Sequence, residues 1–145
     1  DIQHGSETKY FKDGTIQRVT PFKNGKQEGE EITYKKSGAI HSKGNYQNGF
    51  KHGIFQIFKN GKTYEINYHK DLKHGTFKEP NYKSGEDEGE YYLGFKKGIW
   101  KYYDEAGTLL REEFYDFEFS NETPVWYKYY NSDGSLKEKI DFRDY

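Results

Sequence analysis

The sequence predicts an all-β fold: an elongated, twisted, single antiparallel sheet of about six stacked β-hairpin repeats. Three observations predict it. A glycine recurs every 22 to 24 residues, aromatic side chains recur in phase with it, and turn dipeptides separate short runs rich in Tyr, Phe, Ile and Thr. No run is long enough, or apolar at a period of 3.6, to predict a helix. Residues 1–145 are therefore predicted to form a single repeat domain.

Aromatic rather than aliphatic side chains must supply the core. The 145 residues include 15 Tyr, 11 Phe and 2 Trp, and burying such rings stabilises a fold strongly. The formal net charge of −1 lacks the basic excess typical of nucleic-acid-binding proteins. The chain has no Cys, and hence no disulfide or thiolate metal site, and no apolar run of 18 residues that would span a membrane.

The repeat is defined by an anchor position that holds glycine in five of six units. The anchors are Gly5, Gly29, Gly53, Gly75, Gly98 and, as a sixth equivalent, Pro124. Seven residues before the last five anchors stand Phe22, Tyr46, Tyr68, Tyr91 and Phe117. The units span about 4–27, 28–51, 52–73, 74–96, 97–122 and 123–145, and in the sixth, which is one residue longer, Tyr130 takes the place of the ring that stands five residues after most of the other anchors.

Turn signals occur in two series. The first is Asp13-Gly14, Ser37-Gly38, Asn60-Gly61, Ser84-Gly85, Ala106-Gly107 and Asp133-Gly134. The second is Asn24-Gly25, Asn48-Gly49, Asp71-Leu72 and Leu93-Gly94. Asn-Gly and Asp-Gly provide the positive φ that tight hairpin turns need. The runs between the turns, such as 54–58, 99–103 and 125–130, predict about twelve short strands.

The fourth and fifth units depart from the pattern. Pro80 interrupts the first strand of the fourth unit, because proline cannot donate to a central ladder. Residues 86–89, Glu-Asp-Glu-Gly, are then predicted to add an acidic loop. The long stretch 109–119 predicts an extended strand or a bulge in the fifth unit.

The run 44–53, Gly-Asn-Tyr-Gln-Asn-Gly-Phe-Lys-His-Gly, resembles the MORN repeat, and the likeness recurs at 22–25 and 91–98. Where the usual repeat has a second glycine, two residues after the anchor, this chain has Phe55, Phe77 and Trp100. That departure is similar to the bacterial MORN-repeat variant, some of whose members are antitoxins or immunity proteins. The resemblance implies stacked hairpins and binding rather than catalysis. Eukaryotic relatives are linked to membranes or to protein assembly.

A second resemblance covers residues 126–136, which are similar to a choline-binding cell-wall repeat. Such repeats use Trp pairs and Tyr to cage a quaternary ammonium group. Here the only tryptophans, Trp100 and Trp126, lie a full repeat apart, and the Gly-Trp opening of that repeat is missing. The first resemblance is therefore favoured.

The sequence predicts no catalytic site, metal site or cofactor. His4, His52 and His74 share one repeat position, but a hairpin of two strands separates neighbouring units by roughly 10 Å, too far for shared ligation. Residues 86–90 lack the ligand pattern of a calcium loop. We interpret the acidic side chains there, and Glu112 and Glu113, as residues of a solvated strand or loop.

Both faces of the predicted sheet carry rings, because residues two apart share a face. Trp100 and Tyr102 point one way, and Ile99 and Tyr103 point the other. One ladder is predicted to form a thin core, and the other an open groove. The predicted partner-binding residues are Phe55, Phe77, Trp100, Tyr102 and Trp126.

The predicted function is that of a non-catalytic scaffold that binds a protein partner, specifically a cognate toxin on the strength of the resemblance. The alternative is a module that binds a membrane phospholipid or a cell-wall choline or glycan surface. The sequence leaves the oligomeric state and the compartment open. Because it does not begin with Met, we expect that an export signal was removed or that the chain was trimmed.

Overall fold

The computed structural model describes residues 3–81, 85–116, 118 and 123–144. By their contacts these residues group into two compact units, 1–72 and 73–145. Each contains several of the sequence repeats, and "first unit" and "second unit" mean these two larger parts of the chain. The prediction that all 145 residues form one repeat domain stays a prediction.

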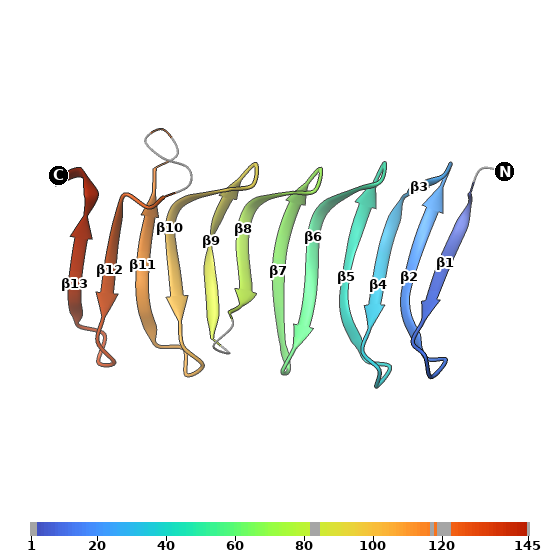
Figure 1. Cartoon of the computed structure of the whole chain (residues 1–145), viewed down its shortest axis with the longest axis horizontal. Helices are drawn as coiled ribbons and strands as arrows, with labels where there is room; N and C mark the ends of the chain where they lie inside the picture. The colour runs from blue at the N-terminus through green and yellow to red at the C-terminus, as the bar shows by residue number, and fades with distance from the viewer. Residues whose placement is uncertain (1–2, 82–84, 117, 119–122, 145) are drawn as a thin grey trace. The chain divides into compact units, whose positions relative to one another are not determined.

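The first unit is an antiparallel sheet whose strands follow one another in chain order (Figure 1). They are β1 (Gly5–Tyr10), β2 (Ile16–Lys23), β4 (Gly29–Tyr34), β5 (Ile40–Gln47), β6 (Phe50–Lys59) and β7 (Lys62–His69). The short strand β3 (Lys26–Gln27) pairs with β2.

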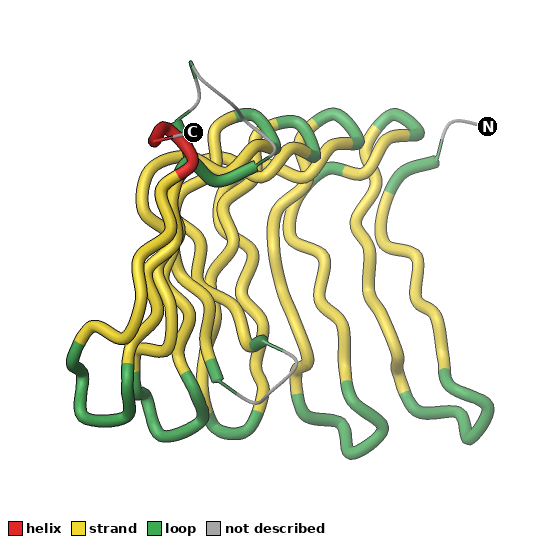
Figure 2. The backbone as a smooth tube through the Cα atoms, turned by 60° about the vertical axis from the view of Figure 1, so that its left-hand side comes forward, coloured by secondary structure: helices red, strands yellow, loops and turns green. Residues whose placement is uncertain are grey.

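The second unit has the same organisation, with each strand hydrogen-bonded to the next. Its strands are β8 (Leu72–Pro80), β9 (Glu86–Tyr92), β10 (Phe95–Tyr103), β11 (Leu109–Tyr115), β12 (Trp126–Tyr130) and β13 (Leu136–Asp141). The only helical segment in the described part of the chain is the 3-10 turn η1 (Phe142–Asp144), at the C-terminal end in Figure 2. The predicted fold class, all-β with antiparallel hairpin repeats, is confirmed.

The Asn-Gly turns have the predicted conformation. At Asn24-Gly25, Asn48-Gly49 and Asn60-Gly61 both residues have positive φ, which is the type I′ geometry that matches the twist of hairpin strands. One predicted turn was placed a residue too late, because the left-handed pair is Lys70-Asp71 and not Asp71-Leu72. Asp71 is held there by Lys51, whose amide nitrogen donates to the Asp71 carboxylate at 2.7 Å. Of the other predicted landmarks, Ser84 and Phe117 lie outside the described residues.

The predicted acidic loop is wrong, because Glu86–Gly89 belongs to strand β9. Each carboxylate has a partner on a neighbouring segment. Glu86 pairs with Lys78 at 2.9 Å, Asp87 accepts from the Asn81 amide at 2.9 Å, and Glu88 accepts from the Tyr103 hydroxyl at 2.7 Å. These contacts let four polar residues continue the sheet.

Each unit has a packed face and an open face. We define the packed face as the one that carries Phe55 in the first unit and Trp100 in the second. The open face carries their neighbours Ile54 and Ile99, because successive strand residues point to opposite faces. The buried apolar side chains are Phe55, Tyr64, Ile66, Phe77, Trp100, Tyr115 and Val125.

Glycines opposite two rings of the packed face allow those rings to approach the backbone of the neighbouring strand. A Cβ on Gly44 would lie 2.3 Å from the Phe55 ring, and a Cβ on Gly89 would lie 2.4 Å from the Trp100 ring. Both glycines sit on the strand next to the ring they face. Each ring therefore lies flat on the backbone of its neighbour.

Candidate functional site

Three of the predicted partner-binding rings lie in the core. Trp100 is 1% exposed, and Phe55 and Phe77 are also buried. Their burial places these rings in the core of the described structure, and their contact with a partner stays a prediction. The reason for the burial is mutual packing, because the Phe55 ring makes edge-to-face contacts with Tyr46 at 5.6 Å and with Tyr68 at 5.2 Å between centroids.

The same packing is tighter in the second unit. Ring centroids are 5.0 Å apart for Phe77 and Trp100, and 4.8 Å apart for Tyr91 and Trp100. The Trp100 indole nitrogen donates to the Glu90 carbonyl oxygen at 3.1 Å, so its one polar atom is satisfied. We call each set of packed rings a ring column: Tyr46, Phe55 and Tyr68 in the first unit, and Phe77, Tyr91 and Trp100 in the second. Each column stabilises the sheet by packing rings from neighbouring strands.

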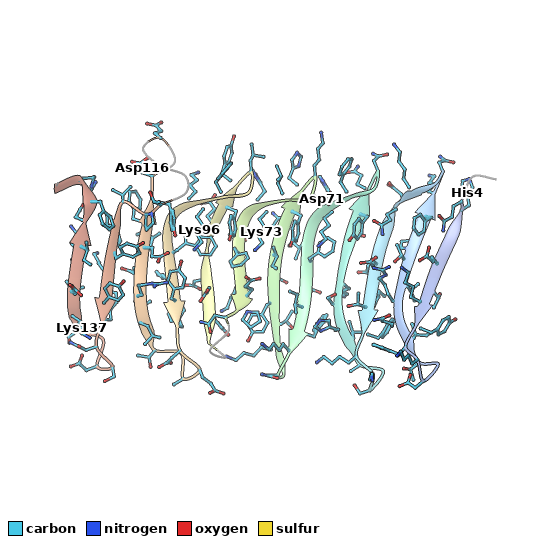
Figure 3. The ribbon with its side chains drawn as sticks, in the orientation of Figure 1. His4, Asp71, Lys73, Lys96, Asp116 and Lys137 are labelled. Atoms are coloured by element: carbon cyan, nitrogen blue, oxygen red, sulfur yellow. The ribbon has the colours of Figure 1, made fainter. Side chains whose placement is uncertain are left out.

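A lysine caps each ring column, and sequence reasoning missed this role. Lys51 lies over Phe55 and Tyr68 at 5.1 and 4.9 Å, and Lys73 lies over Phe77 at 4.4 Å. Lys96 lies over Trp100, also at 4.4 Å. All three stand two residues before an anchor glycine, in the Lys-x-Gly step of the repeat, and Figure 3 labels Lys73 and Lys96. The Lys-x-Gly spacing is present in the sequence, but the cation–π contact of its lysine depends on how the strands pack and was not predicted.

Tyr102, the fourth predicted residue, belongs to a buried polar cluster around Glu113. Glu113 is 5% exposed, which overturns its interpretation as a solvated residue. Its Oε2 atom accepts hydrogen bonds from the hydroxyls of Tyr102 and Tyr115, and Lys96 donates to the Tyr102 oxygen at 2.6 Å. Arg111 completes the cluster with an ion pair to Glu113 at 3.1 Å.

The groups of this cluster have shifted pKa values. Burial, followed by the hydrogen bond and the charge of Glu113, raises the pKa of Tyr102 and of Tyr115 above the ordinary value for tyrosine. Burial lowers the pKa of Lys96, and the neighbouring Glu113 opposes that effect. Tyr102, Tyr115, Lys96 and Arg111 thus each contact another member of the cluster, although the Arg111 Nε atom has no hydrogen-bond partner among the described residues. Among the described residues, no group of three His, Cys, Asp or Glu side chains could hold a metal ion.

Trp126, the fifth predicted residue, lies on the open face, opposite to Trp100. Trp126 pairs with Phe114, whereas Trp100 pairs with Glu113, the preceding residue of β11. The cause is the extra residue of the sixth unit. Counted back from the turn glycine, Trp126 corresponds to Ile99, and a one-residue shift moves a side chain to the other face.

The open face of the second unit therefore carries an apolar row across three strands. We call Ile99, Phe114 and Trp126 the aromatic row. Ile99 is 48% exposed, the other two are half-buried, and the Phe114 and Trp126 rings stack at 5.6 Å. The neighbouring cross-strand row holds Lys101, Glu112 and Lys128.

A hollow of about 530 Å³ adjoins this row. Its lining includes Tyr92, Lys97 and Phe114, of which Phe114 belongs to the aromatic row. Tyr92 and its cross-strand partner Phe95 are themselves exposed. The open face of this unit therefore combines an apolar strip, a recess and a charged border.

These features define a class: a β-hairpin repeat protein whose sheet packs rings on one face and leaves the other open. A family model described as the MORN repeat variant matches residues 3–24, 27–48 and 96–116. The resemblance noted in the sequence is confirmed over those three repeats, which are similar to that variant. A search of curated proteins found no match. In the described parts of the structure, no helix is long and apolar enough to cross a membrane.

Proposed function

We propose that the chain is a non-catalytic repeat scaffold that binds a protein partner through the aromatic row Ile99, Phe114 and Trp126. The observation that carries the proposal is the exposure of Ile99 beside the stacked rings of Phe114 and Trp126. Large apolar side chains that are contiguous and open to solvent mark interaction sites. Tryptophan is among the residues most enriched at the energetic centres of interfaces.

The partner is a folded protein with an apolar projection that fits the strip and its recess. The border of Lys101, Glu112 and Lys128 alternates in charge across the three strands, which suits a polar rim around an apolar centre. Among the five predicted partner-binding residues, Trp126 makes direct contact in this proposal. The resemblance to the MORN repeat variant supports a cognate toxin as the specific partner.

The rigid packed face supports the open one. Phe77, Trp100 and Tyr102 fix the strands from behind, so the aromatic row is presented with little loss of conformational freedom on binding. Phe55 has the same supporting role in the first unit. We therefore propose that these four residues affect binding through the stability of the sheet.

The test is capture of a partner from cells of the source organism with the intact chain. We expect one protein to co-purify at a stoichiometric ratio with the wild type and to be lost with Trp126→Ala, which removes half-buried ring surface. Tyr10→Ala, at another exposed ring, is the matched control and should retain the partner. Sedimentation with phospholipid vesicles or with cell walls, in place of protein capture, would establish the alternative function.

A further inference from the structure

The first unit contains a cavity of about 620 Å³ that the proposed function does not use. It opens near the hairpin turns that connect β1 to β2 and β4 to β5. Its lining includes Lys9, Phe11, Arg18, Thr33, Tyr34 and Ser42. The volume is in the range of small-ligand and peptide side-chain pockets.

Two cations and two hydroxyls form a row along this cavity. In the strand register Lys9 lies opposite Arg18, Arg18 lies opposite Thr33, and Thr33 lies opposite Ser42, on four neighbouring strands. Residues directly opposite one another in an antiparallel sheet share a face. The row therefore offers only hydrogen-bond donors from its first two members and hydroxyl groups from the other two.

One hydrogen-bond donor of this row lacks an acceptor among the described residues. The Nε atom of Arg18 is buried and has no hydrogen-bond partner within the described part of the chain. The nearest carboxylate oxygen, Glu31 Oε2, lies 3.8 Å away and accepts from the Thr20 hydroxyl at 2.7 Å. The hydroxyls of Thr33 and Ser42 are 2.6 Å apart and share one hydrogen bond, and the Thr33 hydroxyl also lies 3.5 Å from the Ser42 carbonyl oxygen, a long contact that a stronger acceptor in the cavity can replace.

The second unit shows what such an arginine binds when its partner is built in. Arg111, on the equivalent strand position, pairs with the Glu113 carboxylate at 3.1 Å and lies over the Tyr102 ring at 4.2 Å. The residue two positions after the arginine is Glu113 in the second unit and Thr20 in the first. The Nε atom of Arg111 is also buried without a hydrogen-bond partner among the described residues, and Arg111 lines a smaller pocket of about 250 Å³. The first unit differs in lacking the carboxylate two residues after its arginine and in the larger cavity beside it.

We infer that this cavity binds the carboxylate of an acidic peptide side chain, with an adjacent apolar side chain against Phe11 and Tyr34. Arginine matches the planar carboxylate with paired donors. The charge balance favours a single negative charge, because Lys9 and Arg18 already have Glu7 and Glu31 at 3.8 Å. The two rings in the lining give the apolar wall that a bare inorganic anion would not need.

The test is a titration of the isotope-labelled full chain, followed by backbone amide resonances. The probe is N-acetyl-Phe-Glu-amide, and its neutral control is N-acetyl-Phe-Gln-amide. We expect the acidic peptide to shift the amides of Lys9, Arg18, Thr33 and Ser42, and the neutral peptide to bind at least tenfold more weakly. Lys9→Gln should weaken binding at least threefold, whereas Lys12→Gln, an exposed lysine in the neighbouring turn, should not.

Two results would overturn the inference: equal affinity for the two peptides, or saturable binding of inorganic phosphate at these amides without binding of the acidic peptide. Lys9 is exposed, so its variant keeps the fold and the result stays interpretable. Partner capture by the aromatic row uses other residues. Failure of this site would therefore leave the Trp126→Ala result unchanged.

Discussion

At the scale of single residues, the contrast between the two faces is sharpest at two neighbours on β10. Trp100 is 1% exposed and makes ring contacts with Phe77 and Tyr91, whereas Ile99 is 48% exposed. The same strand thus supplies one core side chain and one surface side chain. Substitutions at the two positions should separate stability from binding.

We expect Trp100→Ala to lower the free energy of unfolding by about 3–5 kcal/mol, because it empties a ring-sized volume in a close-packed core. Ile99→Thr keeps a β-branched side chain on the open face, so its cost should stay below about 1 kcal/mol. Denaturant unfolding of the two variants and the wild type measures both values. Equal losses would mean that Ile99 is as much a part of the core as Trp100.

Tyr102 should give the unfolding equilibrium an alkaline dependence. Its folded-state pKa is raised by burial and by Glu113, so above about pH 10 the unfolded chain loses a proton that the folded chain keeps. Stability is therefore complete below pH 10 and falls as the pH rises further. Tyr102→Phe should show a smaller loss between pH 9 and pH 11 than the wild type.

The exposed Tyr10 supplies the control for this measurement. Tyr10→Phe removes a hydroxyl from a ring that is 59% exposed and lies outside the Glu113 cluster, so it serves as the matched variant. Indistinguishable curves for the wild type and Tyr102→Phe would show that the Tyr102 hydroxyl is not held by Glu113. Tyr102→Phe also removes an acceptor of Lys96, so the difference between the curves reports on the hydroxyl together with its contact to Lys96.

At the scale of strands and turns, sequence reasoning succeeded where the chemistry is local. Asn-Gly pairs fix their own backbone conformation, so the hairpins at 24–25, 48–49 and 60–61 could be placed without knowing what packs on them. Strand β9 could not be predicted, because its acidic residues depend on partners such as Lys78 and Tyr103 that come from other segments.

The choice between packed and open faces was also out of reach of the sequence pattern. An alternation of apolar and polar residues normally marks the buried face, but here both Ile54 and Phe55 are apolar. What decides is the glycine opposite the ring, Gly44, whose partner becomes visible only once the strand register is known. The reversed face of Trp126 was encoded by the longer sixth unit, but interpreting it requires counting from the turn rather than from the anchor.

Gly44 gives a test of that account. We expect Gly44→Ala to destabilise the chain by more than about 1 kcal/mol, because the new methyl group would overlap the Phe55 ring. The double variant Gly44→Ala with Phe55→Leu should cost less than the sum of the two single changes. A double-mutant cycle measured by denaturant unfolding gives the coupling. Strict additivity would show that the glycine is not there to admit the ring.

At the scale of the whole molecule, a repeat protein differs from a compact enzyme in how its units can specialise. The first unit presents a cationic cavity between its strands, and the second presents the aromatic row and a buried polar cluster around Glu113. Both arise from the same hairpin plan by substitution at equivalent positions, such as Thr20 and Glu113. Repeat architectures gain binding specificity in this way without a change of fold.

The most direct measurement compares partner capture by two variants at the same repeat position. Ile54 and Ile99 each follow an anchor glycine and are 54% and 48% exposed, so Ile54→Glu and Ile99→Glu add the same charge to similar surfaces. The account predicts that a protein captured at a one-to-one ratio by the wild type is retained by Ile54→Glu and lost by Ile99→Glu, with both variants folded by circular dichroism. Retention by Ile99→Glu, or equal loss with both variants, would contradict the claim that the aromatic row is the binding surface.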